Sequence, residues 1–258
     1  MKKIIISVLI IAASLFSSFE SVVINPNSVR IGNITGFKKG DTAALFNFGG
    51  NPGAGASYMV PFGITELSMQ EAYFYSSVKS IPFMISGINF GNADYRENTF
   101  RISASVFSQA GVEICPALKY MNMNTVLGSE SSFGLDISAK YALYEKLTAV
   151  MSVYNIYAYE TDQIDIPMTM MLNFEFRGVE FFNLYTGLEK DGTNPAIFKT
   201  GLEYAPFEFF SVSAGYNFDP ELITAGFAIE YQKLNFSYGM SYHFDLEYSH
   251  SAGLTYEF

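Results

Sequence analysis

The sequence predicts an all-β fold, an antiparallel transmembrane β-barrel of about 14 strands. Three observations support this prediction. Apolar and polar residues alternate with a period of two over segments of about 9–11 residues, the length of a tilted membrane-spanning strand. The chain ends in the alternating stretch 254–258, which stops on the aromatic Phe258. Charged residues make up only 16% of the chain, against roughly 25% in soluble domains.

The N-terminus is predicted to be a signal peptide, residues 1–18. Lys2 and Lys3 form its charged region, and an apolar stretch from Ile4 to Phe16 precedes the small residues that end it. An uncleaved membrane anchor is the alternative, but the apolar stretch is shorter than the ~20 residues that span a bilayer. Together with the terminal strand, the signal predicts the outer membrane of a diderm, Gram-negative-type bacterium.

The strands follow from alternation and from turn residues between the alternating segments. In 225–231, for example, Ala225, Phe227, Ile229 and Tyr231 alternate with smaller or polar residues. The predicted strands are 55–64, 68–78, 81–91, 98–108, 111–122, 132–143, 146–158, 166–177, 179–189, 195–205, 208–217, 221–231, 233–242 and 250–258.

The connections between these strands alternate between tight turns and longer loops. Outer-membrane barrels have short periplasmic turns and longer outer loops. Two connections, 65–67 and 218–220, are shorter than this rhythm requires. A secreted β-sandwich is the competing fold, but long strands, few charges and the terminal aromatic favour the barrel, and closure removes exposed sheet edges. The predicted longer loops are 92–97, 123–131, 159–165, 190–194 and 243–249.

The last strand is predicted to carry the signal read by the barrel-assembly machinery. Leu254, Tyr256 and Phe258 share one face of the strand and are expected to meet outer-membrane lipid. Thr255 and Glu257 share the other face, which is expected to point into the lumen. The expected partners are therefore outer-membrane lipid, which would contact the outer face, and the barrel-assembly machinery, which would bind the terminal signal.

Two segments carry a resemblance to a known family. Residues 47–58 contain Asn51-Pro52-Gly53, and the closing region 225–254 leads through His250 into the final strand. These segments resemble the FadL-like outer-membrane barrels, in particular the PorV/PorQ branch. The chain departs from that pattern at Gly53, where the family usually has alanine, and in 30–45, which lacks dense glycines.

After the signal peptide, the resemblance implies a hatch over residues 19–54 that folds into the periplasmic mouth, followed by the predicted barrel over residues 55–258. It assigns Asn51, Pro52 and Gly53 to a hatch motif. The residue chemistry agrees with a turn there, because proline fixes φ and glycine permits positive φ. The alternative is that 41–54 is an ordinary first strand and turn.

Charged residues within the strands are predicted to face the lumen, since a charge facing lipid at mid-depth costs about 2–4 kcal/mol. Their mixed signs fit either a lumen filled and tied by ion pairs or a path for solutes. The predicted lumen-facing residues are Arg101, Lys119, Asp136, Lys140, Glu175, Lys199, Glu203, Glu230 and Glu257, with Arg177 beside them.

The sequence offers no catalytic or cofactor-binding pattern, and we predict a protein that is not an enzyme and holds no metal. His243 and His250 flank the last loop near Asp245 and Glu247, but without the spacing of a metal motif; they are read as polar loop residues. Acidic outer loops could bind divalent cations, but solvated loops are the simpler interpretation. The lone Cys115 excludes an internal disulfide. The net charge of −10 argues against nucleic acid.

The predicted function is passage of small or hydrophobic solutes across the outer membrane, as the FadL resemblance implies. The PorV/PorQ resemblance implies the alternative, a docking or shuttle component for protein secretion or surface attachment, with a secreted protein as partner. A closed structural barrel is a third possibility.

Overall fold

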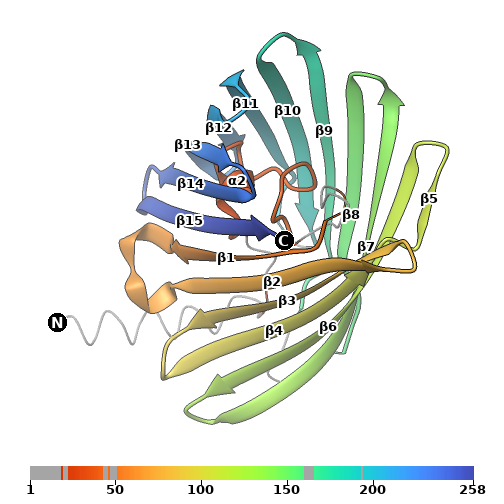
Figure 1. Ribbon diagram of the computed structural model, residues 1–258. Coiled ribbons are helices and arrows are strands. Elements are labelled where there is room, and N and C mark those ends of the chain that lie inside the picture. The colour runs from red at the N-terminus through yellow and green to blue at the C-terminus, as the bar shows by residue number, and fades with distance from the viewer. Residues whose placement is uncertain (1–18, 20–22, 43–45, 47–50, 160–165, 193) are drawn as a thin grey trace.

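The structure, a computed structural model, describes residues 19, 23–42, 46, 51–159, 166–192 and 194–258. It is a closed antiparallel barrel of fourteen strands with one extra short strand (Figure 1). The predicted signal peptide lies outside the described residues. The strands are β1 (Gly53–Val60), β2 (Met69–Val78), β3 (Ile81–Gly91), β4 (Tyr95–Ala104), β5 (Phe107–Gln109), β6 (Val112–Thr125), β7 (Gly128–Tyr144), β8 (Leu147–Ala158), β9 (Thr169–Val179), β10 (Phe182–Asp191), β11 (Ile197–Phe207), β12 (Phe210–Phe218), β13 (Glu221–Tyr231), β14 (Leu234–His243) and β15 (Glu247–Glu257).

The barrel closes between its first and last strands. β1 pairs with β15 from Gly53 opposite Glu257 to Val60 opposite His250. β5 follows β4 after two residues and pairs with β6 alone, while β4 pairs with both β3 and β6. The predicted all-β antiparallel barrel and its strand number are therefore confirmed, and closure leaves no long sheet edge exposed.

Alternation along each strand separates two environments. Leu254 and Tyr256 are 46% and 45% exposed on the outer surface, while Thr255 between them is 4% exposed on the inside. The same pattern recurs on the other strands, so large apolar side chains cover the outside, while the interior combines serine, asparagine, glycine and charged residues with an apolar cluster that includes Tyr75, Met84 and Tyr185. Such an exterior is stable in lipid and costly in water.

One end of the barrel has six connections of two residues each, from Lys79-Ser80 to Gln232-Lys233; we call it the tight-turn end. Two of these turns come later than the sequence predicts. Gly178 lies within β9, and Pro206 lies within β11 at an irregularity in its pairing with β12. Proline there interrupts the ladder without ending the strand, which is why the sequence predicts a turn at this position.

The opposite end, the loop end, has connections that are mostly short. The predicted loop 123–131 is wrong, because β6 and β7 extend to the two-residue tip Val126-Leu127. Polar residues suggested a loop there, but Asn122 donates hydrogen bonds across the hairpin to Ser129 (3.0 Å) and Ser131 (3.1 Å). β15 likewise begins at Glu247, inside the predicted last loop. Most of the predicted loop 159–165 lies outside the described residues.

Between β1 and β2 the loop end holds two 3-10 turns, η1 (Pro61–Gly63) and η2 (Thr65–Leu67). In the part of the chain that is described, no helix has the length and apolar character needed to cross a membrane.

Residues 23–42, which we call the inner segment, lie inside the barrel and include the short helix α2 (Pro26–Val29) (Figure 1). The side chain of Asn25 caps α2 by accepting from the backbone N–H of Asn27 at 2.8 Å. The Asp41 carboxylate accepts from the Ser28 hydroxyl at 3.2 Å and from the Gly36 N–H at 2.5 Å. These bonds fold the segment into a compact unit although it has little regular secondary structure.

Candidate functional site: the lumen and its inner segment

The inner segment rests on a row of glycines that we call the glycine track. A methyl group at Gly201 would lie 2.2 Å from the carbonyl oxygen of Ile31, and one at Gly226 would lie 2.7 Å from Cβ of Arg30. These approaches are possible only because glycine has no side chain. The track contributes one residue from each of six consecutive strands, β15 to β10: Gly253, Gly239, Gly226, Gly215, Gly201 and Gly187.

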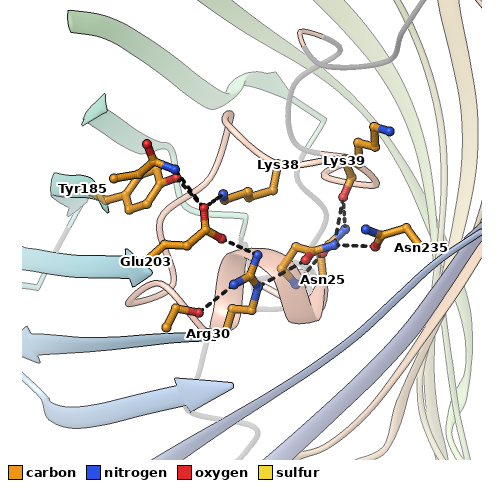
Figure 2. A network of polar contacts seen from close by, with 10 residues as sticks. Asn25, Arg30, Lys38, Lys39, Tyr185, Glu203 and Asn235 are labelled. Atoms are coloured by element: carbon orange, nitrogen blue, oxygen red, sulfur yellow. Dashed lines mark hydrogen bonds and ion pairs between the residues drawn. The ribbon is translucent and has the colours of Figure 1, made fainter. Parts of the chain in front are cut away.

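A buried ion-pair network joins the inner segment to β11 (Figure 2). The Glu203 carboxylate lies 2.5 Å from Nη2 of Arg30 and 2.6 Å from Nζ of Lys38. Arg30 also donates to the Ser213 hydroxyl at 2.8 Å, and Asn183 donates to Glu203 at 3.0 Å. Burial lowers the pKa of Lys38 despite the attraction of Glu203. Two cations facing one carboxylate fix the segment in position and are costly to separate.

Lys39 makes a second, more solvated attachment. Its Nζ lies 2.6 Å from Glu230 and 3.0 Å from Glu257. Burial opposes the charge on Lys39, but hydrogen bonds with the two carboxylates outweigh it and raise its pKa. A cavity of about 350 Å³ near the tight-turn end is lined by both lysines of the inner segment, Glu203 and Glu230. This cavity is the water-accessible side of the network.

Asp136 is the centre of a second buried cluster. It lies 2.9 Å from Nζ of Lys119 and 3.2 Å from Nη2 of Arg101, and it accepts from the backbone N–H of Asn155 at 2.8 Å. The pairing of β7 with β8 shifts register around Asp136, which brings Asn155 toward the carboxylate. Arg101 also donates to the carbonyl oxygen of Thr42, so the cluster reaches the inner segment.

The remaining predicted lumen residues also make contacts inside. Lys199 pairs with Glu189 and donates to the carbonyl of Asn33 at 3.2 Å. Lys140 donates to the carbonyl of Phe46 at 3.3 Å. Glu175 is buried and pairs with the exposed Arg177 at 2.8 Å. These residues form several separate pairs along the wall, and the structure does not bring them together in one site.

The predicted hatch motif lies where the chain enters β1. The Pro52 carbonyl accepts from the backbone N–H of Phe258 at 2.8 Å. Gly53 lies against the ring of Tyr75, where a methyl group would come within 2.3 Å of the phenol oxygen. Asn51 is exposed. The motif therefore joins the start of the barrel wall to its end.

The two histidines lie at the loop end. Nδ1 of His250 is 2.6 Å from the Tyr238 hydroxyl on the exposed face of the wall, and His243 accepts from the backbone N–H of Asp245 at 3.1 Å. Among the described residues, no group of three or more potential metal ligands is present.

Sequence reasoning missed an apolar surface inside the loop end, which we call the apolar band. Met59, Met69 and Phe90 stand opposite one another across β1, β2 and β3. Met121 and Met123 form a second apolar cluster on β6, and Glu97 of β4 lies in register between Phe90 and Met123. Ile24 packs against Met59 and Met69, and Phe19 and Ile166 pack against the β6 methionines. Methionine recurs in these strands, but one sequence does not indicate which methionines gather.

Comparison with known proteins gives similarity of fold. No family model matches the chain, and no curated protein matches its sequence. Among solved structures, a TodX monoaromatic hydrocarbon channel mutant is 9% identical with a TM-score of 0.65, covering 90% of this chain and 98% of that one. The CymD monoaromatic hydrocarbon channel is 11% identical with a TM-score of 0.62, covering 91% and 99%. The Acinetobacter baumannii outer membrane protein Omp33 is 7% identical with a TM-score of 0.54, covering 81% and 98%.

The fold and the lumen thus define a class: a closed β-barrel shaped like those of outer-membrane channels. More particularly, the chain shares its fold with two hydrocarbon channels. At these identities the likeness concerns fold, and function has to be argued from the lumen itself.

Proposed function

We propose that this protein is a non-enzymatic barrel of the outer membrane that passes small or hydrophobic solutes. The apolar band is the observation that carries the proposal. We propose that the barrel is oriented with its loop end facing outward and its tight-turn end facing the periplasm. Residues 1–18 would be removed on export, and the inner segment, which precedes β1 in the chain, would act as a hatch within the lumen.

The apolar band is separate from the larger apolar cluster that Ile31, Ile34 and Phe37 of the inner segment form with the wall. Apolar surface near an open mouth is unfavourable unless something covers it. In the structure its cover comes from Phe19, Ile24 and Ile166. An apolar solute entering from the loop end could replace these contacts, and methionine side chains adapt to ligands of different shape. The two hydrocarbon channels of similar fold make an apolar solute the first one to test.

Uptake into vesicles with a lipopolysaccharide outer leaflet tests the proposal, because toluene crosses a plain phospholipid bilayer without any protein. Toluene is the apolar probe and arabinose is the polar probe. We expect the protein to accelerate toluene entry, and the double variant Met69→Ser, Met123→Ser to reduce that acceleration about tenfold, because the two serines remove apolar surface that the solute would contact. Met151→Ser on the lipid-facing surface is the matched control.

No acceleration of either probe by folded protein would contradict passage. That result would favour the third possibility, a closed structural barrel, for which the inner segment inside the barrel is the supporting observation. The alternative of docking for protein secretion has no specific support in the described residues, and the fully described connections at the loop end, such as the tip Val126-Leu127, offer little surface for a large partner.

A further inference from the structure

We propose that the inner segment is an internal clamp that closes the barrel during folding: it binds the inner face of the second half of the wall and thereby brings β1 to β15. This role goes beyond the proposed function and does not depend on it, since a closed barrel is needed whether or not a solute passes.

The path of the inner segment supports the clamp, because its contacts run from β15 at Ile24 back to β8 at Gly36, with residues 30–32 spread over β11 to β13. Ile24 accepts from Ser251 on β15 at 2.5 Å. Gly32 donates to Thr224 on β13 at 3.0 Å. Close contacts elsewhere in the segment reach the other strands, as far as the start of β8. They join Pro26 to Gly253 (β15) and Gly239 (β14), Arg30 to Gly226 (β13), Gly32 to Gly215 (β12), Ile31 to Gly201 (β11), Ile34 to Gly187 (β10), Thr35 to Asn173 (β9) and Gly36 to Val150 (β8).

The inner segment and this wall also complete each other's hydrogen bonding. Asn173 donates to the Thr35 carbonyl at 3.0 Å, and Lys199 donates to the Asn33 carbonyl. Backbone groups buried outside regular structure must find such partners. The segment's conformation therefore depends on the wall, and eight consecutive strands are bridged by one short stretch of chain.

After reaching β8, the inner segment returns to the seam of the barrel. Lys39 pairs with Glu257, and Glu257 is the register partner of Gly53, the first residue of β1. Joining β1 to β15 without this attachment would require closing a loop of roughly 200 residues, with the entropy cost of ordering its ends. When Lys39 is already bound to Glu257, only the short stretch of chain from Lys39 to Gly53 separates β1 from β15. The effective concentration of β1 at β15 is therefore higher.

The order of contacts during refolding tests the clamp. In a Cys115→Ala background, one full-length variant carries Asn27→Cys and Asn235→Cys, whose native side chains lie 3.3 Å apart. The other carries Tyr58→Cys and Ala252→Cys, which face each other across the β1–β15 seam. The chains refold from urea into phosphatidylcholine vesicles and are sampled over time with a short bis-methanethiosulfonate cross-linker. We expect the segment–wall cross-link to form before the seam cross-link. A seam that forms first would overturn the proposal.

Glycine substitutions give a second test. Gly201→Ala places a methyl group against the Ile31 carbonyl, whereas Gly87→Ala meets nothing closer than 3.6 Å. We expect Gly201→Ala to slow seam cross-linking about tenfold or to prevent it, through the lost effective concentration, and Gly87→Ala to leave the rate unchanged. Equal rates for the two variants would contradict the clamp. Toluene uptake is not measured in either test, so failure of the clamp and failure of the proposed passage remain distinguishable.

Discussion

At the scale of single residues, the charges inside the barrel depend on partners distant in sequence. Alternation identified Arg101, Lys119 and Asp136 as candidates for the lumen, because charges on the other face would meet lipid. Their convergence was not predictable, since it depends on the register of β4, β6 and β7 and on the irregular pairing beside Asn155. The face of a strand on which a residue lies follows from its neighbours in sequence, whereas the partner of its side chain is set only when the barrel has closed.

The cluster around Asp136 leads to a stability prediction. Asp136→Ala leaves two buried cations without their carboxylate, and we expect a loss of about 3–5 kcal/mol in the free energy of unfolding. Urea unfolding in detergent, followed by gel mobility, measures it. Asp245→Ala at the exposed loop end is the control and should change stability by less than about 0.5 kcal/mol. Equal effects of the two substitutions would show that the buried cluster contributes no more to the free energy of unfolding than an exposed loop residue does.

Lys39 leads to a pH prediction. Its pKa is raised in the folded protein, so its contribution to stability is fully present below the pKa of free lysine, about 10.4, and is lost as pH rises through the folded value. Because Lys39 is 37% exposed, we expect Lys39→Met to cost only about 0.5–1 kcal/mol at pH 8. Urea midpoints of wild type and variant should converge at strongly alkaline pH; a difference independent of pH would refute this role.

At the scale of elements, the strands were predictable and the connections less so. A period of two and a run of turn residues depend on neighbouring positions alone, and each predicted strand has its counterpart in the barrel. The sequence predicts a loop around Val126-Leu127 because the asparagine and serine residues that pair across this hairpin are also common in loops. The inner segment shows no period at all, since its conformation is set by the wall it touches.

The last strand leads to a prediction about assembly. Phe258 is exposed on the outer surface, and its ring centroid is 5.6 Å from that of Tyr256 and 6.5 Å from that of Phe74. We expect Phe258→Ser to lower the amount of folded protein in the outer membrane several-fold, because the terminal aromatic is part of the proposed assembly signal. Phe244→Ser, at an exposed phenylalanine of the loop end, is the matched control. Unchanged assembly of Phe258→Ser would show that the signal lies elsewhere.

At the scale of the whole molecule, the apolar exterior determines which solvent the protein needs. A closed barrel keeps its backbone hydrogen bonds satisfied within lipid, but its surface is unsuited to water. We expect the purified protein to require detergent and to change gel mobility on boiling, because the barrel resists unfolding in detergent until it is heated. Solubility without detergent, with no change on boiling, would contradict a membrane barrel.

The two-residue tip between β6 and β7 has a practical consequence. Val126 and Leu127 are 79% and 88% exposed, and Thr125 and Gly128 on either side are still paired. An epitope inserted between them would extend the hairpin without entering the wall or the lumen. Intact cells carrying it would bind antibody if the loop end faces outward, so this tip can report the orientation of the barrel in a living membrane.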